Sequence, residues 1–405
     1  MKNLIVFSAA GMGDRYSAAA PTFWTTMNGF VKAGWQVWVF NASAKEGVTN
    51  RVDYPDGLHL IQQAPPWRKQ TQIKKIGHAF ALSQLAWIRR WQRKQAEALI
   101  AKEGLDKTNT VIYGAEGISV LAAADIHTAC GLKLVTRFFG IWDMFTKPYT
   151  WKNRILCYPK FDAYRVAADL TIMTNDGTQG DKMLRRVGNE GKNIVFWRNG
   201  VDIPDPKQEA AQIPGLEPGD KVLITLSRLH PGKRVDRAIR ALAEVRRTHP
   251  EAKLLICGYG DEEKKLKRIT EEENLQNAVI FTGGISHDQV FSYLKRGDIF
   301  LSFYEASNLG NPLFEAMRCG LPVIASDVGE TKTVVIHGQN GLLLSGENLE
   351  EEIPRAICRL LEDEDLRKRL GQGSLRFAQE NFWTWEERVQ AEIDAVGALL
   401  APDRE

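Results

Sequence analysis

The stretch that decides the fold is residues 297–344, which read GDIFLSFYEASNLGNPLFEAMRCGLPVIASDVGETKTVVIHGQNGLLL. The apolar run Ile299–Phe303 predicts a buried strand, and the polar loop after it leads into a helix that begins near Pro312. A second apolar run, Pro322–Ala325, follows Gly320 and predicts the next strand. A strand, a loop, a helix and another strand in this order are typical of a parallel sheet.

Glu315 lies in the first turn of the predicted helix, where its carboxylate can reach the carboxyl edge of the sheet. Open α/β sheets bind their ligands at that edge, and two carboxylate oxygens can accept both hydroxyls of a ribose. A plainer interpretation is a negative charge that the helix dipole favours. Glu315 is therefore a candidate ribose ligand only in combination with a second feature.

Such a feature occurs in residues 221–248, KVLITLSRLHPGKRVDRAIRALAEVRRT, which predict a buried strand, a polar loop and an amphipathic helix. Arg228 and Lys233 lie in the loop, with Pro231–Gly232 between them, just before the helix begins. Free backbone N–H groups and the positive helix end favour anions there, and both cations suit phosphate oxygens. Loop cations are otherwise simply solvated, so the specific signal is their combination with Glu315.

Apolar runs of strand length alternate with helical patterns along the chain, which predicts an α/β protein with two doubly wound parallel sheets. The predicted strands are Leu4–Ser8, Gln36–Phe40, Val111–Tyr113, Lys133–Thr136, Leu170–Met173, Ile194–Trp197, Val222–Leu226, Lys253–Cys257, Val279–Thr282, Ile299–Phe303, Pro322–Ala325 and Gly341–Leu344. Residues 199–220 contain four prolines and no apolar periodicity, which indicates a linker. We expect a first domain over residues 1–198 and a second over residues 221–375, with helices after it.

The composition is that of an ordinary globular protein of 405 residues, with 44% hydrophobic and 25% charged side chains. Five scattered cysteines without a CxxC pattern indicate a reducing compartment and no structural zinc. No apolar run approaches the roughly 18 to 20 residues that span a bilayer. The opening MKNLIVFSAAGMGD loses its apolar character at Gly11, so it predicts a first strand and loop instead of a signal peptide.

Two familiar ligand motifs are incomplete. The first loop contains Gly11 and Gly13, but the third glycine position of the dinucleotide pattern is Tyr16, so nicotinamide binding is disfavoured. The DxD sequence at residues 363–365 lies in the charged stretch LEDEDLRKRL, which is typical of a solvated helix face. We therefore expect no metal and no cofactor, and no carboxylate nucleophile stands out.

The order of five motifs resembles the retaining glycosyltransferases of family four, which have the GT-B fold. The motifs are SRLHPGKRVDRAI, LLICGYGDE, VIFTGGIS, LFEAMRCGLPVIAS and GQNGLLL, within residues 220–345, with weaker matches at NGVD, VKAGWQVWVF and FWTWEERV. The resemblance implies two Rossmann-like domains facing across a cleft and a last helix, over residues 376–405, that crosses back to the first domain. It also implies transfer of a sugar from a nucleoside-diphosphate donor with retention of configuration.

The resemblance also implies roles for single residues. Arg228 and Lys233 would stabilise the leaving diphosphate, and Glu315 would bind the ribose of the donor. The other donor-binding residues that it implies are Gly13, Gly258, Gly283, Ile285, Asn311 and Leu313.

Two positions depart from the family pattern. The family's first glutamate lies eight residues before the second, where this chain has Ser307, whereas Glu305 lies ten residues before Glu315. Either two residues are inserted and Glu305 serves, or Ser307 and Asn308 replace the acid.

The second departure is on the acceptor side, where the family often has His–Gly and this chain has Phe139–Gly140. The acceptor-side candidates are therefore Arg137, Phe139 and Asp143. His127 lies on a predicted helix, and we interpret it as structural.

Residues 67–94, WRKQTQIKKIGHAFALSQLAWIRRWQRK, hold eight cations, three tryptophans and no acid. Residues 1–100 have 13 basic and 5 acidic side chains, a net charge of +8, against +3 for the whole chain. A basic helix with tryptophans suits an anionic membrane surface. The alternatives are an ordinary surface helix whose aromatics face the core, and a nucleic-acid contact, which no recognised module supports.

Together these features predict a metal-independent glycosyltransferase with a lipid-linked or saccharide acceptor, acting in polysaccharide or lipopolysaccharide biosynthesis. We expect it to be cytoplasmic and peripheral on the inner face of the cytoplasmic membrane. One alternative is a sugar-nucleotide epimerase or hydrolase on the same fold, which would release free nucleotide without an acceptor. The other is a degenerate membrane-bound scaffold, against which the intact Arg228, Lys233 and Glu315 argue.

Overall fold

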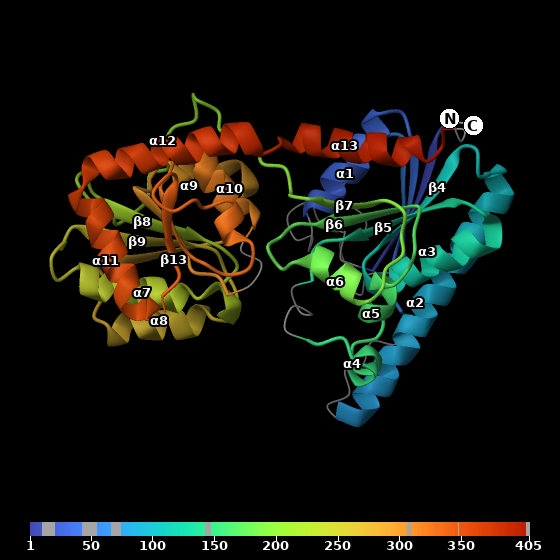
Figure 1. Cartoon of the computed structure of the whole chain (residues 1–405), viewed down its shortest axis with the longest axis horizontal. Coiled ribbons are helices and arrows are strands. Elements are labelled where there is room, and N and C mark those ends of the chain that lie inside the picture. Colours follow the sequence, from blue (N-terminus) through green and yellow to red (C-terminus); the bar gives the residue numbers. More distant parts are fainter. Residues whose placement is uncertain are drawn as a thin grey trace. The chain divides into compact units, whose positions relative to one another are not determined.

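The computed structural model describes residues 1–9, 21–42, 55–65, 74–141, 147–305, 309–346 and 348–401. The chain forms two compact units, each with its own sheet (Figure 1). The first unit comprises Met1–Asn175, Gly180–Trp197 and Trp385–Glu405. The second comprises Asp176–Gln179 and Arg198–Thr384, so residues 199–220 are counted with it.

Within its described residues, the first unit has a seven-stranded parallel sheet in the order β3-β2-β1-β4-β5-β6-β7. Its strands are β1 (Asn3–Ser8), β2 (Gln36–Asn41), β3 (Leu58–Gln62), β4 (Thr110–Ala115), β5 (Lys133–Phe138), β6 (Leu170–Thr174) and β7 (Ile194–Trp197). Its helices are α1 (Pro21–Lys32), α2 (Lys74–Glu103), α3 (Gly117–Cys130), α4 (Trp151–Leu156), α5 (Lys160–Tyr164), α6 (Gly180–Arg186) and α13 (Trp385–Ala398).

Both faces of this sheet are buried. Strand β1 shows this, because alternate residues of a strand point to opposite sides of the sheet. In β1, Leu4 and Val6 belong to the core shared with α1 and α13, and Ile5 and Phe7 belong to the core shared with α2 and α3. All four side chains are fully buried. Burial on both faces explains why these strands appear in the sequence as continuous apolar runs.

The second unit has, over its described part, a six-stranded parallel sheet in the order β10-β9-β8-β11-β12-β13. Its strands are β8 (Lys221–Leu226), β9 (Ala252–Cys257), β10 (Val279–Gly283), β11 (Ile299–Ser302), β12 (Val323–Ser326) and β13 (Gly341–Leu344). Its helices are α7 (Val235–Val245), α8 (Glu263–Glu272), α9 (Val290–Leu294), α10 (Asn311–Arg318), α11 (Leu349–Glu362) and α12 (Glu364–Asn381).

The strand order of the second sheet creates a place for a ligand. The chain moves outward from β8 through β9 to β10, and it then returns to the other side of β8 at β11. The loops that leave the carboxyl ends of β8 and β11 therefore diverge to opposite faces of the sheet. Open α/β sheets bind ligands in the crevice at such a switch point.

The predicted fold class is confirmed, and all twelve predicted strands occur within one or two residues of their expected bounds. The prediction missed β3, whose sequence LHLIQ includes a single buried residue, Leu58. A strand at the edge of a sheet has little apolar surface to bury, so its sequence pattern is weak.

Helix α13 packs against α1 inside the first unit. A Cβ atom at Gly29 of α1 would lie 2.1 Å from Cγ1 of Val389, so the small glycine permits the close approach of the two helices. A buried polar cluster adds to this packing: Tyr113 Oη donates to Glu392 at 2.5 Å, and Arg388 pairs with the same carboxylate at 2.9 Å. Charged groups are stable in a core only when they are paired in this way.

Helix α2 carries the described part of the basic segment, with side chains described from residue 81 onward. Trp91 lies in the core, and Trp87 packs beside it with ring centroids 5.8 Å apart. Arg89 donates to both carboxylate oxygens of Asp125, at 2.7 and 2.6 Å. This part of α2 therefore fits the alternative of an ordinary surface helix with core-facing aromatics. Trp67 lies outside the described residues.

Candidate functional site

The loop after β8 presents the two predicted phosphate ligands. Arg228 is exposed, and Lys233 ends a 3-10 turn, Pro231–Lys233. His230 holds this turn, because its Nδ1 accepts a hydrogen bond of 3.2 Å from the backbone of Gly232. Helix α7 begins two residues after Lys233, so both cations lie at its N-terminal end, where the dipole favours an anion.

Lys233 lies over a fixed aromatic side chain. Its Nζ is 4.1 Å from the ring centroid of Tyr304, which follows β11. The hydroxyl of Tyr304 donates to the carbonyl of Leu226 at 2.8 Å and fixes the ring. Burial lowers the pKa of Lys233 from 10.5 to about 8. A bound anion would favour the charged ammonium again, which suits a group that meets developing negative charge.

Tyr304 also connects this loop with Glu315. Burial raises the pKa of Tyr304 above its usual value, and the nearby Glu315 carboxylate contributes to the increase. Lys233 and Glu315 thus lie in the segments that follow β8 and β11, on either side of the switch point, and Tyr304 interacts with both.

Glu315 lies on α10, which begins at Asn311 with Pro312 in its first turn. The residue is only 5% exposed, and burial raises the pKa of its carboxyl from 4.5 to about 8, with a smaller contribution from Asp202. His287 lies between the two acids. Its Nε2 is 3.7 Å from Glu315 Oε1, and its Nδ1 is 3.7 Å from Asp202 Oδ2.

Glu305 makes contacts with the loop after β8. Its carboxylate pairs with Arg234 at 2.5 Å and with Arg237 at 3.3 Å, and its backbone N–H donates to Gly232. Arg234 has a left-handed φ of 48°, which a non-glycine residue adopts only when its surroundings hold it. Glu305 is thus committed to two guanidinium groups. Ser307 and Asn308 lie outside the described residues.

Glycines allow the loops after β8, β9 and β10 to lie against one another. A Cβ atom at Gly258 would lie 1.8 Å from the carbonyl oxygen of Ser227, and one at Gly260 would lie 2.3 Å from that of Leu229. The N–H of Gly258 donates to the carbonyl of Gly283 at 2.9 Å, and Gly283 has a φ of 70°. Close backbone packing is a sufficient reason for glycine at position 258, and the left-handed φ is a sufficient reason at position 283.

The other predicted donor ligands differ in which of their groups a bound ligand could contact. The side-chain oxygen of Asn311 accepts from Asn199 at 3.1 Å. Leu313 is fully buried, so a ligand could meet it only through its backbone, whereas Ile285 is partly buried and packs against the same core. Gly13 lies outside the described residues.

On the acceptor side, Arg137 is buried in the first unit. It donates to the carbonyl of Phe138 at 2.6 Å and to Thr174 Oγ1 at 2.7 Å, and its guanidinium lies 4.6 Å from the ring centroid of Phe139. Its Nε is also 3.8 Å from Glu392. These contacts indicate a structural role for Arg137. Asp143 lies outside the described residues.

His127 lies near the end of α3, where its Nδ1 is 2.6 Å from the carbonyl oxygen of Leu132. That contact joins the helix to the residue before β5. It agrees with the interpretation of His127 as structural.

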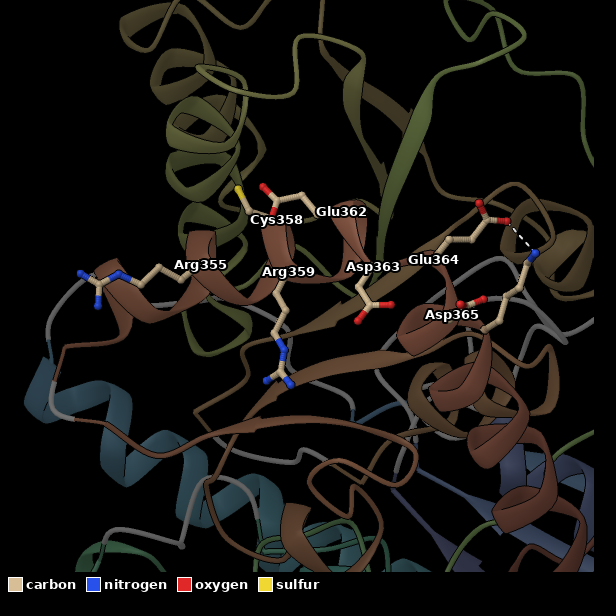
Figure 2. A pocket seen from close by; sticks show the side chains of 8 residues that line it. Arg355, Cys358, Arg359, Glu362, Asp363, Glu364 and Asp365 are labelled. Carbon is tan, nitrogen blue, oxygen red and sulfur yellow. Dashed lines mark ion pairs between the residues drawn. The ribbon is translucent and has the colours of Figure 1, made fainter.

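The acidic sequence 363–365 lies at a surface hollow between α11 and α12 (Figure 2). Asp363 caps α12, because its side chain accepts from the N–H of Leu366 at 2.8 Å, and Glu364 pairs with Lys368 at 2.6 Å. In Figure 2 the side chains of Asp363 and Glu364 point in different directions. Across the described residues, no group of three or more His, Cys, Asp or Glu side chains has an arrangement suited to a metal ion.

Sequence reasoning missed Tyr304, His287 and Asp202. Tyr304 reads as the end of a buried strand, and its place beneath Lys233 depends on the pairing of β8 with β11. His287 and Asp202 are 85 positions apart, so only the fold brings them to Glu315. Asp202 lies in the NGVD motif, which was a weak sign that this stretch is more than a linker.

Comparison with known proteins agrees with this geometry. The structure of sucrose-phosphate synthase from Thermosynechococcus elongatus superposes with a TM-score of 0.77 at 18% identity, over 99% of both chains. An uncharacterized glycosyltransferase of Methanocaldococcus jannaschii is 35% identical over 170 residues, 42% of this chain and 43% of that protein.

A third relative is a GDP-mannose-dependent alpha-(1-6)-phosphatidylinositol monomannoside mannosyltransferase of Mycolicibacterium smegmatis. It is 31% identical over 238 residues, which are 51% of this chain and 62% of that protein. The chain thus spans about half the length of the curated relatives it matches.

Two Rossmann-like units of parallel sheet, with a phosphate-type loop at the switch point of the second, define the GT-B class of fold. Residues 206–376 match the family described as glycosyl transferases group 1. The matched residues lie in the second unit. Among the described helices, none is both long and apolar enough to cross a bilayer.

Proposed function

We propose that this protein is a glycosyltransferase that moves a sugar from a nucleoside-diphosphate sugar to a lipid-linked or saccharide acceptor, with retention of configuration. The observation that carries the proposal is that Lys233 and Glu315 lie in the segments after β8 and β11, at the switch point of the second sheet, and that Tyr304 interacts with both. One side of this place suits phosphate and the other suits a ribose.

Negative charge develops on the diphosphate as the bond to the sugar breaks. Lys233, Arg228 and the N-terminal end of α7 would stabilise this charge, which is the interaction that lowers the barrier most in such sites. Because protein cations supply the positive charge, the reaction is proposed to need no metal ion. Glu315 would accept the ribose hydroxyls and thereby orient the donor.

Near the sugar, we propose that Ser307 and Asn308 take the place of the family's first glutamate. The support is the commitment of Glu305 to Arg234 and Arg237. A short polar side chain can accept a hydrogen bond from a sugar hydroxyl without a charge.

The acceptor is proposed to be lipid-linked, and the protein to work in the cytoplasm at the inner face of the membrane, in polysaccharide or lipopolysaccharide assembly. The name of the Mycolicibacterium relative includes a phosphatidylinositol mannoside, which is a lipid acceptor. The net charge of +8 over residues 1–100 suits an anionic surface.

The test is a binding screen followed by a transfer assay. UDP, GDP and ADP would be titrated by calorimetry into the wild type and into Glu315→Gln, and we expect at least one diphosphate to bind the wild type and to bind the variant more weakly. The matching nucleotide sugar should then release its diphosphate only when an acceptor extract is present. Addition of EDTA to the buffer should not reduce this release. No binding of any diphosphate would overturn the proposal, and equal release without an acceptor would support the hydrolase alternative.

A further inference from the structure

Helix α4 exposes apolar side chains that none of the described residues of the first unit covers. Trp151 is 78% exposed, Ile155 is 60% exposed and Leu156 is 56% exposed. No residue of this helix is buried. Trp151 and Ile155 are four residues apart, so they lie on one face of the helix, with Leu156 beside Ile155. Figure 1 shows α4 at the margin of the first unit, away from the sheet.

The surroundings of this apolar face are strongly basic. Residues 147–165 include five cations and a single acid, Asp162. That acid is already paired, because Arg154 contacts it at 2.5 Å. Lys147 and Lys152 are exposed on either side of Trp151. An apolar tip on a segment with five cations and one acid matches the headgroup layer of an anionic bilayer in both polarity and charge.

We infer that α4 is the element through which this protein docks on an anionic lipid bilayer, with Trp151, Ile155 and Leu156 inserted among the headgroups. This inference rests on the proposed function, since a bilayer at α4 would supply a lipid-linked acceptor. It moves the membrane contact from α2, where the described tryptophans face the core and Arg89 is paired with Asp125.

The support beneath α4 is rigid enough to present the apolar face. Tyr149, just before the helix, packs on the buried Phe161 with ring centroids 5.2 Å apart. Its hydroxyl accepts from Arg165 at 2.8 Å. The side chain of Thr150 caps α4 by accepting from the N–H of Asn153. The helix is therefore anchored at its beginning, while its apolar side chains stay uncovered.

A second copy of the chain is the rival occupant of this face. Stable protein interfaces bury about 800 Å² on each partner and require some twenty residues a side. Three side chains on a helix of six residues offer much less, and the surrounding like charges would repel each other across a symmetric contact. A lipid surface needs no such area, because it follows any protruding apolar group.

The test is flotation of the full-length protein with vesicles of phosphatidylcholine alone or with one third phosphatidylglycerol. The triple variant Trp151→Ser/Ile155→Ser/Leu156→Ser should bind the anionic vesicles at least about tenfold more weakly than the wild type, since buried apolar area sets the strength of such binding. The matched control is Ile203→Ser/Tyr259→Ser, which removes two side chains of the second unit that are each 65% exposed. The control should bind like the wild type.

Further measurements distinguish a lipid surface from a second copy of the chain. Lys147→Gln/Lys152→Gln should weaken binding to the anionic vesicles, and so should raised salt. Wild-type binding that ignores phosphatidylglycerol, or a triple variant that floats like the wild type, would overturn the inference. A wild-type dimer that the triple variant converts to a monomer in sedimentation would do the same, in favour of a second copy. Diphosphate titration of each sample reports on the proposed function separately, because those ligands belong to the second unit.

Discussion

At the scale of single residues, Lys233 is a group whose charge depends on its surroundings. Its pKa of about 8 means that the free protein loses this cation within the mildly alkaline range. We predict that diphosphate affinity of the wild type falls, relative to Lys233→Arg, as the pH rises above about 8, because arginine stays charged. Calorimetric titrations of both proteins between neutral and alkaline pH measure this difference.

The comparison with Lys233→Arg removes effects of pH on other groups, Glu315 included. Lys233→Ala should lower the transfer rate by about 10² to 10³, as loss of a preorganised charge-stabilising group does. Parallel pH profiles for the wild type and Lys233→Arg would show that the Lys233 charge is not what holds the diphosphate.

Glu315 gives a prediction for stability. Its folded pKa of about 8 lies above the ordinary 4.5, so the folded protein keeps a proton that the unfolded chain releases. The contribution of Glu315 to stability is therefore complete below about pH 4.5 and is lost as the pH rises through 8. We predict that the unfolding free energy of Glu315→Gln, which cannot ionise, increasingly exceeds that of the wild type as the pH rises from 5 to 9. The difference should reach a few kcal/mol at the alkaline end.

Urea unfolding of both proteins at acidic, neutral and alkaline pH measures that prediction. The same substitution should weaken diphosphate binding. Glu315 would then lower the unfolding free energy of the protein and at the same time increase its affinity for the ligand. Unfolding free energies of the two proteins that run parallel across this pH range would contradict the raised pKa.

At the scale of elements, the close contact of α1 with α13 allows a sharper test than the sheets do. Alanine normally stabilises a helix relative to glycine. At Gly29, however, a methyl group would meet the stiff, β-branched side chain of Val389. We predict that Gly29→Ala destabilises the protein by about 1 to 3 kcal/mol.

A double-mutant cycle with Val389→Ala distinguishes this clash from other causes. The second substitution should be less costly in the Gly29→Ala background than in the wild type, because it removes the obstructing methyl group. Additive effects of the two substitutions on the unfolding free energy would contradict the packing described for α1 and α13.

How much of each element could be predicted from the sequence depended on whether local pattern or tertiary contact decided it. Twelve strands were predictable because they form apolar runs of strand length between helical patterns. Helix α2 was harder, since interleaved tryptophans and cations fit a membrane face as well as a core face, and only the position of Trp91 in the core distinguishes the two. The apolar face of α4 is too short to produce a periodic pattern.

The candidate site divides in the same way. Glu315 and Lys233 each lie in a motif that is continuous in the sequence, so both could be predicted as ligands from the order of the residues. His287 and Asp202 come near Glu315 from separate loops, and Arg234 combines a φ of 48° with an ion pair to the distant Glu305. Contacts between distant segments leave no local trace in a single sequence.

At the scale of the whole molecule, the two units have separate cores, and the described residues of the proposed donor site belong to the second. A ligand that binds a folded unit stabilises it by about 2.7 kcal/mol at a hundredfold excess over its dissociation constant. We predict that a diphosphate slows amide hydrogen exchange in residues 198–384 and leaves the sheet of the first unit unchanged. Mass spectrometry of peptides from both units measures this, and equal protection of both would show that the ligand is not confined to the second.

The place of α13 has a consequence for how the protein is made. Chains emerge from the ribosome with the N-terminus first, and domains generally fold as they appear. Here β1 and α1 are synthesised before the second unit, yet Val389 and Glu392, which fill the space beside Gly29 and Tyr113, come after the entire second unit. The first unit therefore lacks this helix until the second unit has been synthesised. A premature stop codon before residue 385 would leave the later-made unit whole and the earlier-made one unfinished.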